Sequence, residues 1–486
     1  MQLRRRSVFN LPGVILFVLA CAGAVGPVSG AAGILPANVH QAVAQQVKTN
    51  PDGLVRVIVT QTPAASGVED AAVALGARIT ARWSMINSFA AEVPARSVSA
   101  LAKNPGVRAV LSSSPTVSTA TVDETRLKSA YPYAVRAEEA WRAGYTGSGV
   151  TIAIVDSGVH TADGTNSDFG GRISHSVSFH KNAAFTTDRF GHGTHVAAIA
   201  AGNGQTGDGA YTGIAPGANL INVKFSDDEG RASEEDLINA LQWVYDHREA
   251  YNIRIVNISS TVSTQQSYLE SATSAAVEQL WAAGLVVVVS AGNRGGEDCA
   301  TCYAPAHDPF VISVGAVDDA GTRSLTDDFA KEWSSAGETL DGHMKPDITA
   351  PGAHVTAYMP TGSLRTKAPD NIVDHSYFRM GGTSMAAPVV SGSVALLLEA
   401  RPDLTPNQVK WLLTKTARTY QGQPSGTPGA LDIWEAINYS GSIGEANQNL
   451  KMSPLLDPMS GTINYSNTLW GNTLWGNTLW GNAFEL

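Results

Sequence analysis

The chain has 486 residues, of which 43% are hydrophobic and 16% are charged, and its formal net charge is −10. This length and composition indicate a globular protein with two or three domains and a large core. The excess of acidic residues argues against a nucleic-acid partner, which would need a basic surface to neutralise phosphates.

The N-terminus has the pattern of an export signal. Arg4–Arg6 precede a short apolar run, Val14–Val25, and then small residues. This order is typical of a secretory signal peptide, and the apolar run is short for a membrane span. We therefore expect residues 1–30 to be a signal peptide and the mature protein to be secreted. Attachment to the cell surface, for instance through a lipid on Cys21, is the alternative.

Only two cysteines remain once such a signal is removed, Cys299 and Cys302 in "CATC". In an exported protein this spacing favours a small disulfide loop over half of a zinc site. A tetrahedral zinc site would need two further ligands, and nothing nearby repeats the spacing.

Residues 50–120 predict a small α/β unit directly after the signal. "LVRVIV" (Leu54–Val59), "INSFAAEV" (Ile86–Val93) and "VRAVLSS" are indicated as strands, and helical stretches separate them. The polar residues 121–135 that follow are expected to form an exposed linker.

Residues 136–440 have a different character, in which continuous apolar segments alternate with amphipathic helical stretches. The apolar segments are "TIAIVD", "NLINVKF", "IRIVNIS", "LVVVVS" and "VISVGAV". Buried β-branched strands that alternate with helices predict a doubly wound parallel sheet, the α/β class. In such sheets functional residues collect at the carboxyl ends of the strands.

Three glycine-flanked turns in this region carry an acid, an imidazole and a hydroxyl. Asp156 ends the first apolar strand, His192 lies in "GHGTH", and Ser384 in "GGTSMA" begins a long apolar helix. Each residue alone would pass as a turn or cap residue. A serine nucleophile, however, needs an imidazole to take its proton, and that imidazole needs a carboxylate. The chain order Asp, His, Ser differs from the α/β-hydrolase order of Ser, acid, His.

The segments "IAIVDSGV", "GHGTHVAAIAAG" and "GGTSMAAPVVSG" resemble the three signature blocks of the subtilisin-like serine proteases, and the likeness spans about Arg136–Tyr439. This resemblance implies that Asp156 is the triad acid, His192 the general base and Ser384 the nucleophile. It also implies that His195, the second histidine of "HGTH", is structural, so no metal ligand is expected in this pair.

The resemblance extends to the residues around the substrate. It implies that Asn293 in "SAGN" donates its side-chain amide to the oxyanion. The substrate-binding walls implied in the same way are Ser259, Ser260, Thr261, Ser290, Ala291 and Gly292. The segment "NISST" departs from the Ser-Leu-Gly that is common in the family at this wall.

Metal dependence is the next expectation. Asp168 in "NSDFGG" resembles a calcium-ligand position of the family, but the Asn-rich loop expected after the histidine helix is replaced by "GNGQTGDGAYTG". We therefore expect that no cofactor is required and leave structural calcium open.

The N-terminal unit resembles the inhibitory propeptide of the same family, a small ferredoxin-like α+β domain, with "SFAAEVPARSVSALAKNPGVRAVL" carrying most of the likeness. The resemblance implies a zymogen that is cleaved between about Ser113 and Ala134. The expected partners are protein or peptide substrates and the chain's own propeptide, and we expect a monomer.

Residues 441–486 are expected to be a C-terminal tail. The sequence Thr-Leu-Trp-Gly-Asn occurs three times between Thr468 and Asn482, and a period of five fits neither a helix nor a strand. A disordered tail is favoured over an adhesive or sorting segment. The whole sequence predicts a secreted serine endopeptidase made as a zymogen; the alternative is a noncatalytic surface or adhesion protein on the same fold.

Overall fold

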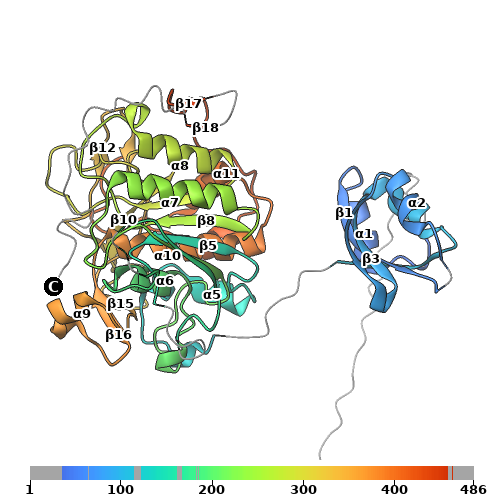
Figure 1. Cartoon of the computed structure of the whole chain (residues 1–486), viewed down its shortest axis with the longest axis horizontal. Helices are drawn as coiled ribbons and strands as arrows, with labels where there is room; N and C mark the ends of the chain where they lie inside the picture. Colours follow the sequence, from blue (N-terminus) through green and yellow to red (C-terminus); the bar gives the residue numbers. More distant parts are fainter. Residues whose placement is uncertain are drawn as a thin grey trace, which may run out of the picture. The chain divides into compact units, whose positions relative to one another are not determined.

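The computed structural model describes residues 35–63, 65–113, 122–160, 167–181, 183, 185–457 and 462–463. The chain divides into two compact units, Met1–Thr116 and Val117–Leu486 (Figure 1). The predicted signal peptide, Cys21 and the Thr-Leu-Trp-Gly-Asn repeats lie outside the described residues.

The N-terminal unit is a four-stranded antiparallel sheet with helices. Its elements are α1 (Gln41–Thr49), β1 (Leu54–Gln61), α2 (Val68–Ala74), β2 (Arg78–Trp83), β3 (Ser88–Pro94), α3 (Val98–Ala102) and β4 (Val107–Ser112). The strand order β2-β3-β1-β4 and the chain order β-α-β-β-α-β from β1 onward make a ferredoxin-like arrangement. The sequence analysis did not predict α1 or β2.

The second unit is built on an eight-stranded sheet. Its strands are β5 (Thr151–Asp156), β6 (Ile173–Ser178), β7 (Asn219–Lys224), β8 (Ile253–Ile258), β9 (Val286–Ser290), β10 (Ile312–Asp318), β11 (Phe329–Ala330) and β14 (Ile348–Pro351). The order is β11-β10-β9-β8-β5-β7-β6, with β14 also paired to β10. All pairs are parallel except β10–β11. This sheet confirms the predicted α/β class.

Helices cover both faces of this sheet. Helices α7 (Glu234–His247) and α8 (Ala272–Ala282) lie on one face, and α6 (His192–Ala201) and α10 (Thr383–Ala400) lie together on the other (Figure 1). Helix α10 is long and apolar enough to cross a membrane, but 89% of it is buried inside the protein. It is therefore the central core helix of this unit.

The shorter elements complete the second unit. They are α4 (Tyr131–Ala134), α5 (Ala137–Arg142), β12 (Gly337–Glu338), β13 (Met344–Lys345), β15 (Val355–Tyr358), α9 (Ser363–Lys367), β16 (Tyr377–Met380), α11 (Pro406–Thr416), α12 (Ile433–Asn438), β17 (Leu456–Asp457) and β18 (Thr462–Ile463).

The chain reverses its direction of travel across the sheet at β5. After β5 it builds β6 and β7 on one side, and it then builds β8, β9 and β10 on the other side. Such a switch point opens a crevice outside the carboxyl ends of the strands, where ligands bind in this class of fold. Asp156 is the last residue of β5 and lies at this switch point.

The second half of the expected linker is not exposed. Leu127, Tyr131, Tyr133 and Val135 are buried in the core of the second unit. The segment "YPYA" forms α4, and its aromatic rings supply apolar area that this core covers. The linker prediction was therefore wrong from Leu127 onward.

The predicted tail also begins later than expected. The backbone N–H of Ser453 donates to Glu278 Oε2 at 2.6 Å, and the hydroxyl of Tyr268 donates to the carbonyl oxygen of Lys451 at 2.9 Å. Leu455 is buried. Residues 441–457 are thus a segment packed on the second unit rather than the start of a free tail.

Candidate active site

A buried carboxylate and a buried imidazole meet at the switch point. His192, the first residue of α6, places its Nδ1 2.9 Å from Oδ1 and 3.1 Å from Oδ2 of Asp156. A carboxylate only accepts hydrogen bonds, so Nδ1 donates and Nε2 is left to accept a proton from another group. This is the tautomer that a general base needs.

Asp188, which the sequence analysis did not single out, organises the loop that leads to His192. Its buried carboxylate accepts hydrogen bonds from the backbone N–H groups of Phe190, Gly191 and Thr194, and from the hydroxyls of Thr194 and Ser157. Burial raises the pKa of Asp188. The available signal was an acid shortly before a glycine-led helix, where carboxylates commonly satisfy free N–H groups.

His195, the second histidine of "HGTH", bonds to a backbone carbonyl instead of a carboxylate. It is fully buried, and its Nε2–H donates to the carbonyl oxygen of Phe378 at 2.9 Å. Burial lowers the pKa of His195 to about 3, so the ring is neutral at ordinary pH.

Ser384 is the second residue of α10 and is tied to the end of β8. Its hydroxyl donates to the carbonyl oxygen of Ser259 at 3.1 Å, and the Ser259 hydroxyl donates to the carbonyl oxygen of Ser384 at 3.0 Å. Strand β8 is paired with β5, which ends in Asp156. Ser384 and the Asp156–His192 pair are therefore anchored at the carboxyl ends of two neighbouring strands.

The side chain of Asn293 is fixed in one orientation. Its Oδ1 accepts from the backbone N–H of Thr383 at 2.8 Å and from the Thr383 hydroxyl at 3.0 Å. A backbone N–H can only donate, so the atom facing it is the oxygen, and the Nδ2 amide points elsewhere. The amide donor is thus held beside the turn that carries Ser384.

The expected substrate-binding residues form two uncharged segments. Ser259, Ser260, Thr261, Ser290 and Ala291 are buried, and Gly292 has a φ of +104°, which favours glycine. The residues that follow these two segments are hydrogen-bonded to each other. The N–H of Val262 donates to the carbonyl oxygen of Ala304 at 2.8 Å, and the N–H of Gln266 donates to that of Cys302 at 3.2 Å.

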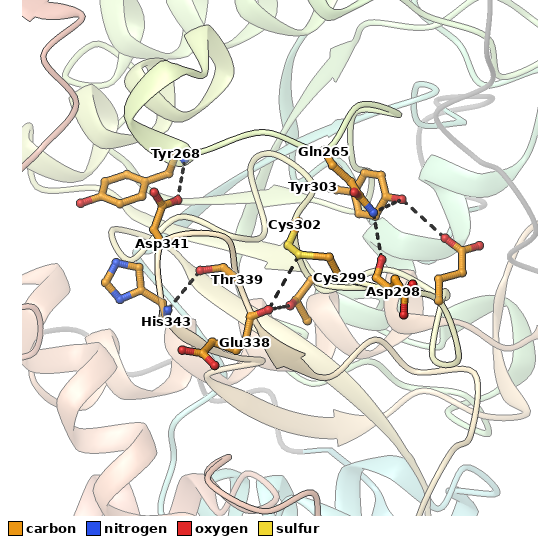
Figure 2. The surroundings of a disulfide bond; sticks show 12 residues. Gln265, Tyr268, Asp298, Cys299, Cys302, Tyr303, Glu338, Thr339, Asp341 and His343 are labelled. Carbon is orange, nitrogen blue, oxygen red and sulfur yellow. Dashed lines mark hydrogen bonds between the residues drawn. A yellow bond between two sulfur atoms is a disulfide. The ribbon is translucent and has the colours of Figure 1, made fainter.

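A disulfide between Cys299 and Cys302, with Cα atoms 5.3 Å apart, closes the loop after Asn293 (Figure 2). This confirms the disulfide interpretation of "CATC". Next to it, the Gln265 side chain donates to the carbonyl oxygen of Asp298 and to the hydroxyl of Tyr303. The loop is therefore held both covalently and by side chains from the opposite segment.

Asp168, whose sequence position resembles a calcium ligand, is hydrogen-bonded to two other segments of the protein. Its buried Oδ2 accepts from the Tyr377 hydroxyl at 2.6 Å, and Oδ1 accepts from the Thr206 N–H at 2.7 Å. Both oxygens thus accept a hydrogen bond from another part of the protein. Within the described ranges, no group of three or more His, Cys, Asp or Glu side chains is arranged to hold a metal ion.

Comparison with known proteins identifies the family. Residues 147–432 match the subtilase family, peptidase S8. The chain is 36% identical to serine protease AprX of Bacillus subtilis (strain 168) over 318 residues, which cover 64% of this chain and 70% of that protein. It is 31% identical to subtilisin E of the same organism over 356 residues, which cover 71% of this chain and 79% of subtilisin E. The chain therefore belongs to the subtilase family and is a subtilisin-like serine endopeptidase.

Proposed function

We propose that peptide bonds of proteins are cleaved by a triad of Asp156, His192 and Ser384, with Asn293 as oxyanion donor. The observation that carries the proposal is the 2.9 Å contact between His192 and Asp156 at the strand edge where Ser384 is anchored. The Ser384 hydroxyl turns from the Ser259 carbonyl toward His192 Nε2 by rotation about χ1 and attacks the substrate carbonyl carbon.

Proton transfers and charge stabilisation follow from the same groups. His192 takes the proton of Ser384, and Asp156 stabilises the resulting imidazolium. The negative oxygen of the tetrahedral intermediate accepts hydrogen bonds from Asn293 Nδ2 and the Ser384 backbone N–H. His192 then gives its proton to the leaving amine, and a water molecule hydrolyses the acyl-enzyme by the same route.

The substrate would bind as an extended strand between the segments Ser259–Thr261 and Ser290–Gly292. These segments carry only hydroxyl, methyl and hydrogen side chains. An uncharged side chain in the primary pocket is therefore expected, because a charged one would find no counter-ion on these walls.

Secretion and zymogen processing are parts of the same proposal, with residues 1–30 as signal peptide and the N-terminal unit as an intramolecular inhibitor. Alternate residues of β1, such as Val55 and Val57, are buried on one face of the sheet in that unit. The other face carries the exposed Arg56 and the half-buried Ile58. An open sheet face of this kind is suited to cover another surface. Because Leu127, Tyr131 and Tyr133 are buried, cleavage is expected before Leu127, within residues 114–126. We propose that the mature enzyme acts as a monomer without a required metal.

The decisive comparison is between the wild type, Ser384→Ala and Ser391→Ala. Ser391 lies in the same helix and is buried, with its hydroxyl bonded to Asn257 Oδ1, so it controls for removal of a hydroxyl from α10. Ser384→Ala should abolish casein digestion, labelling by a fluorophosphonate and self-cleavage, with kcat lower by about 10⁶-fold, the loss known for a subtilisin nucleophile. Ser391→Ala should keep all three. Fluorophosphonate labelling that persists in Ser384→Ala would place the nucleophile elsewhere.

A further inference from the structure

Lys224 is a fully buried lysine directly beside the proposed triad. It is the last residue of β7, and its Cα pairs in register with that of Asp156 at the end of β5. Burying an ammonium group is costly unless it is paired and hydrogen-bonded. Its partners therefore indicate what the site gains from it.

The ammonium group of Lys224 joins the loop after β5 to the loop before α6. Its Nζ donates to the carbonyl oxygen of Ser157 at 2.7 Å and to that of Thr187 at 3.4 Å. It also forms an ion pair with Asp228 at 3.3 Å. Ser157 directly follows the acid Asp156, and Thr187 lies in the loop that leads into α6 and His192.

The same two loops are also joined by hydrogen bonds of the Ser157 hydroxyl. The Ser157 hydroxyl donates to Asp188 Oδ1 at 3.0 Å and accepts the N–H of Gly193 at 2.9 Å. Ser157 is thus held through its hydroxyl by the histidine loop and through its carbonyl by Lys224. Removal of the ammonium would leave two carbonyl oxygens without this donor and would allow the loops to separate.

We propose that Lys224 is a positioning residue, which sets the distance between Asp156 and His192 by fixing the backbone on both sides of the pair. The proposal rests on the triad assignment made above. Lys224 is buried, so it acts through these two carbonyl groups and its ion pair with Asp228 rather than through substrate. Catalysis is sensitive to this geometry, because a displacement of about 1 Å can lower the rate by about 100-fold.

The test uses Lys224→Met, which keeps an unbranched side chain of similar length but has no donor. We expect kcat on a peptide amide to fall roughly 10- to 100-fold, with KM almost unchanged, since substrate does not contact this residue. The rate of fluorophosphonate labelling of Ser384 should fall in parallel. Lys224→Arg, which keeps a cation with N–H donors, should recover part of kcat.

Lys410→Met is the matched control. Lys410 is also buried, and its Nζ also donates to two carbonyl oxygens, those of Pro309 and Val311, and pairs with Asp347 at 2.8 Å. It lies in α11, and these three partners lie outside the loops that carry Asp156 and His192. Both lysine-to-methionine variants should lower the Tm, and only Lys224→Met should lower kcat.

A wild-type kcat in folded Lys224→Met, or an equal loss of kcat in Lys410→Met, would overturn the proposal. If Lys224→Met does not fold, Lys224→Gln takes its place: this shorter neutral donor cannot span both carbonyls, so an unchanged kcat overturns the proposal equally well. Ser384→Ala is assayed alongside. Activity in that variant would refute the triad itself, whereas inactive Ser384→Ala with fully active Lys224→Met refutes only the role of Lys224.

Discussion

Thr383 and Asn293 show how one residue determines what another can do. Thr383 presents an N–H and a hydroxyl to Oδ1 of Asn293, and its hydroxyl also accepts the N–H of Gly292 at 3.1 Å. In the proposed oxyanion role, the amide of Asn293 therefore needs no reorientation when charge develops on the substrate oxygen. A donor that is oriented in advance stabilises the transition state more than one that must turn toward it.

Replacement of Asn293 by alanine should lower kcat by about 10²–10³-fold, the range for loss of such a donor, for which a subtilisin is the reference case. KM should change little, because the oxyanion exists only in the transition state. Steady-state kinetics on a peptide amide measure both constants. Asn438→Ala, at an exposed asparagine in α12, serves as control, and an equal loss of kcat there would contradict the role of Asn293.

Thr383, Asp188 and Lys224 also mark the limit of prediction from the sequence. Asp156, His192 and Ser384 were candidates because each sits in a glycine-flanked turn that is visible along the chain. Asp188 precedes such a turn, but Thr383 and Lys224 act through partners that are distant in the sequence. Asn293 Oδ1 meets Thr383 from 90 residues away, and Lys224 Nζ meets Ser157 O across 67 residues. Only the folded chain brings these partners together.

At the scale of elements, the central strands of the second unit were predictable from the sequence, whereas the edge strand β2 of the N-terminal unit was not. β5, β8 and β9 are buried along their whole length or nearly so, and this leaves continuous apolar runs in the sequence. β2 alternates exposed and half-buried residues and carries two arginines, so its apolar signal is weak. α4 was missed because four residues are too few to show a helical period.

The bond between Tyr377 and Asp168 ties β16 to the segment before β6, and Asp168 in turn accepts the N–H of Thr206 in the loop after α6. Tyr377→Phe should lower the unfolding free energy by about 1–3 kcal/mol, because a buried carboxylate loses a donor. If the proposed enzyme needs no metal, a chelator should also leave the Tm of the wild type unchanged.

Urea unfolding and thermal melts, with and without EDTA, measure these effects. The control is Tyr251→Phe, a half-buried tyrosine whose ring stacks on His175 and Trp243. A Tm that EDTA lowers and added calcium restores would show that a bound ion stabilises the fold.

At the scale of the whole molecule, the segment 441–457 is bound to α8 through a hydrogen bond to the buried acid Glu278. Glu278 is fully buried and accepts the N–H of Ser453 through Oε2. Burial, together with the nearby carboxyl of Asp308, raises the pKa of Glu278 well above its ordinary value. The folded state therefore keeps a proton that the unfolded chain releases above about pH 4.5.

This difference predicts the direction of a pH effect on stability. The contribution of Glu278 is complete below its unfolded pKa and is lost as the pH rises toward the folded pKa, with a slope of up to about 1.4 kcal/mol per pH unit. Glu278→Gln should remove this slope. Its free energy of unfolding should exceed that of the wild type at pH 8 and approach it at pH 4.

Urea unfolding at both pH values tests this, with Ser384→Ala as the background in every sample to prevent self-digestion. The control is Glu435→Gln, which makes the same chemical change in α12. A Glu278→Gln variant that is less stable than the wild type at pH 8 would mean that Glu278 is ionised in the folded state.

The interior lysines have a consequence for covalent attachment of the enzyme to a support. Lys224, Lys345 and Lys410 are buried, and each ammonium donates to carbonyl or carboxylate oxygens. Amine-reactive linkers need a solvent-accessible, deprotonated nitrogen, so they acylate surface lysines such as Lys128 and Lys451 instead. Immobilisation through lysine chemistry therefore spares the cations that hold the interior of the catalytic unit together.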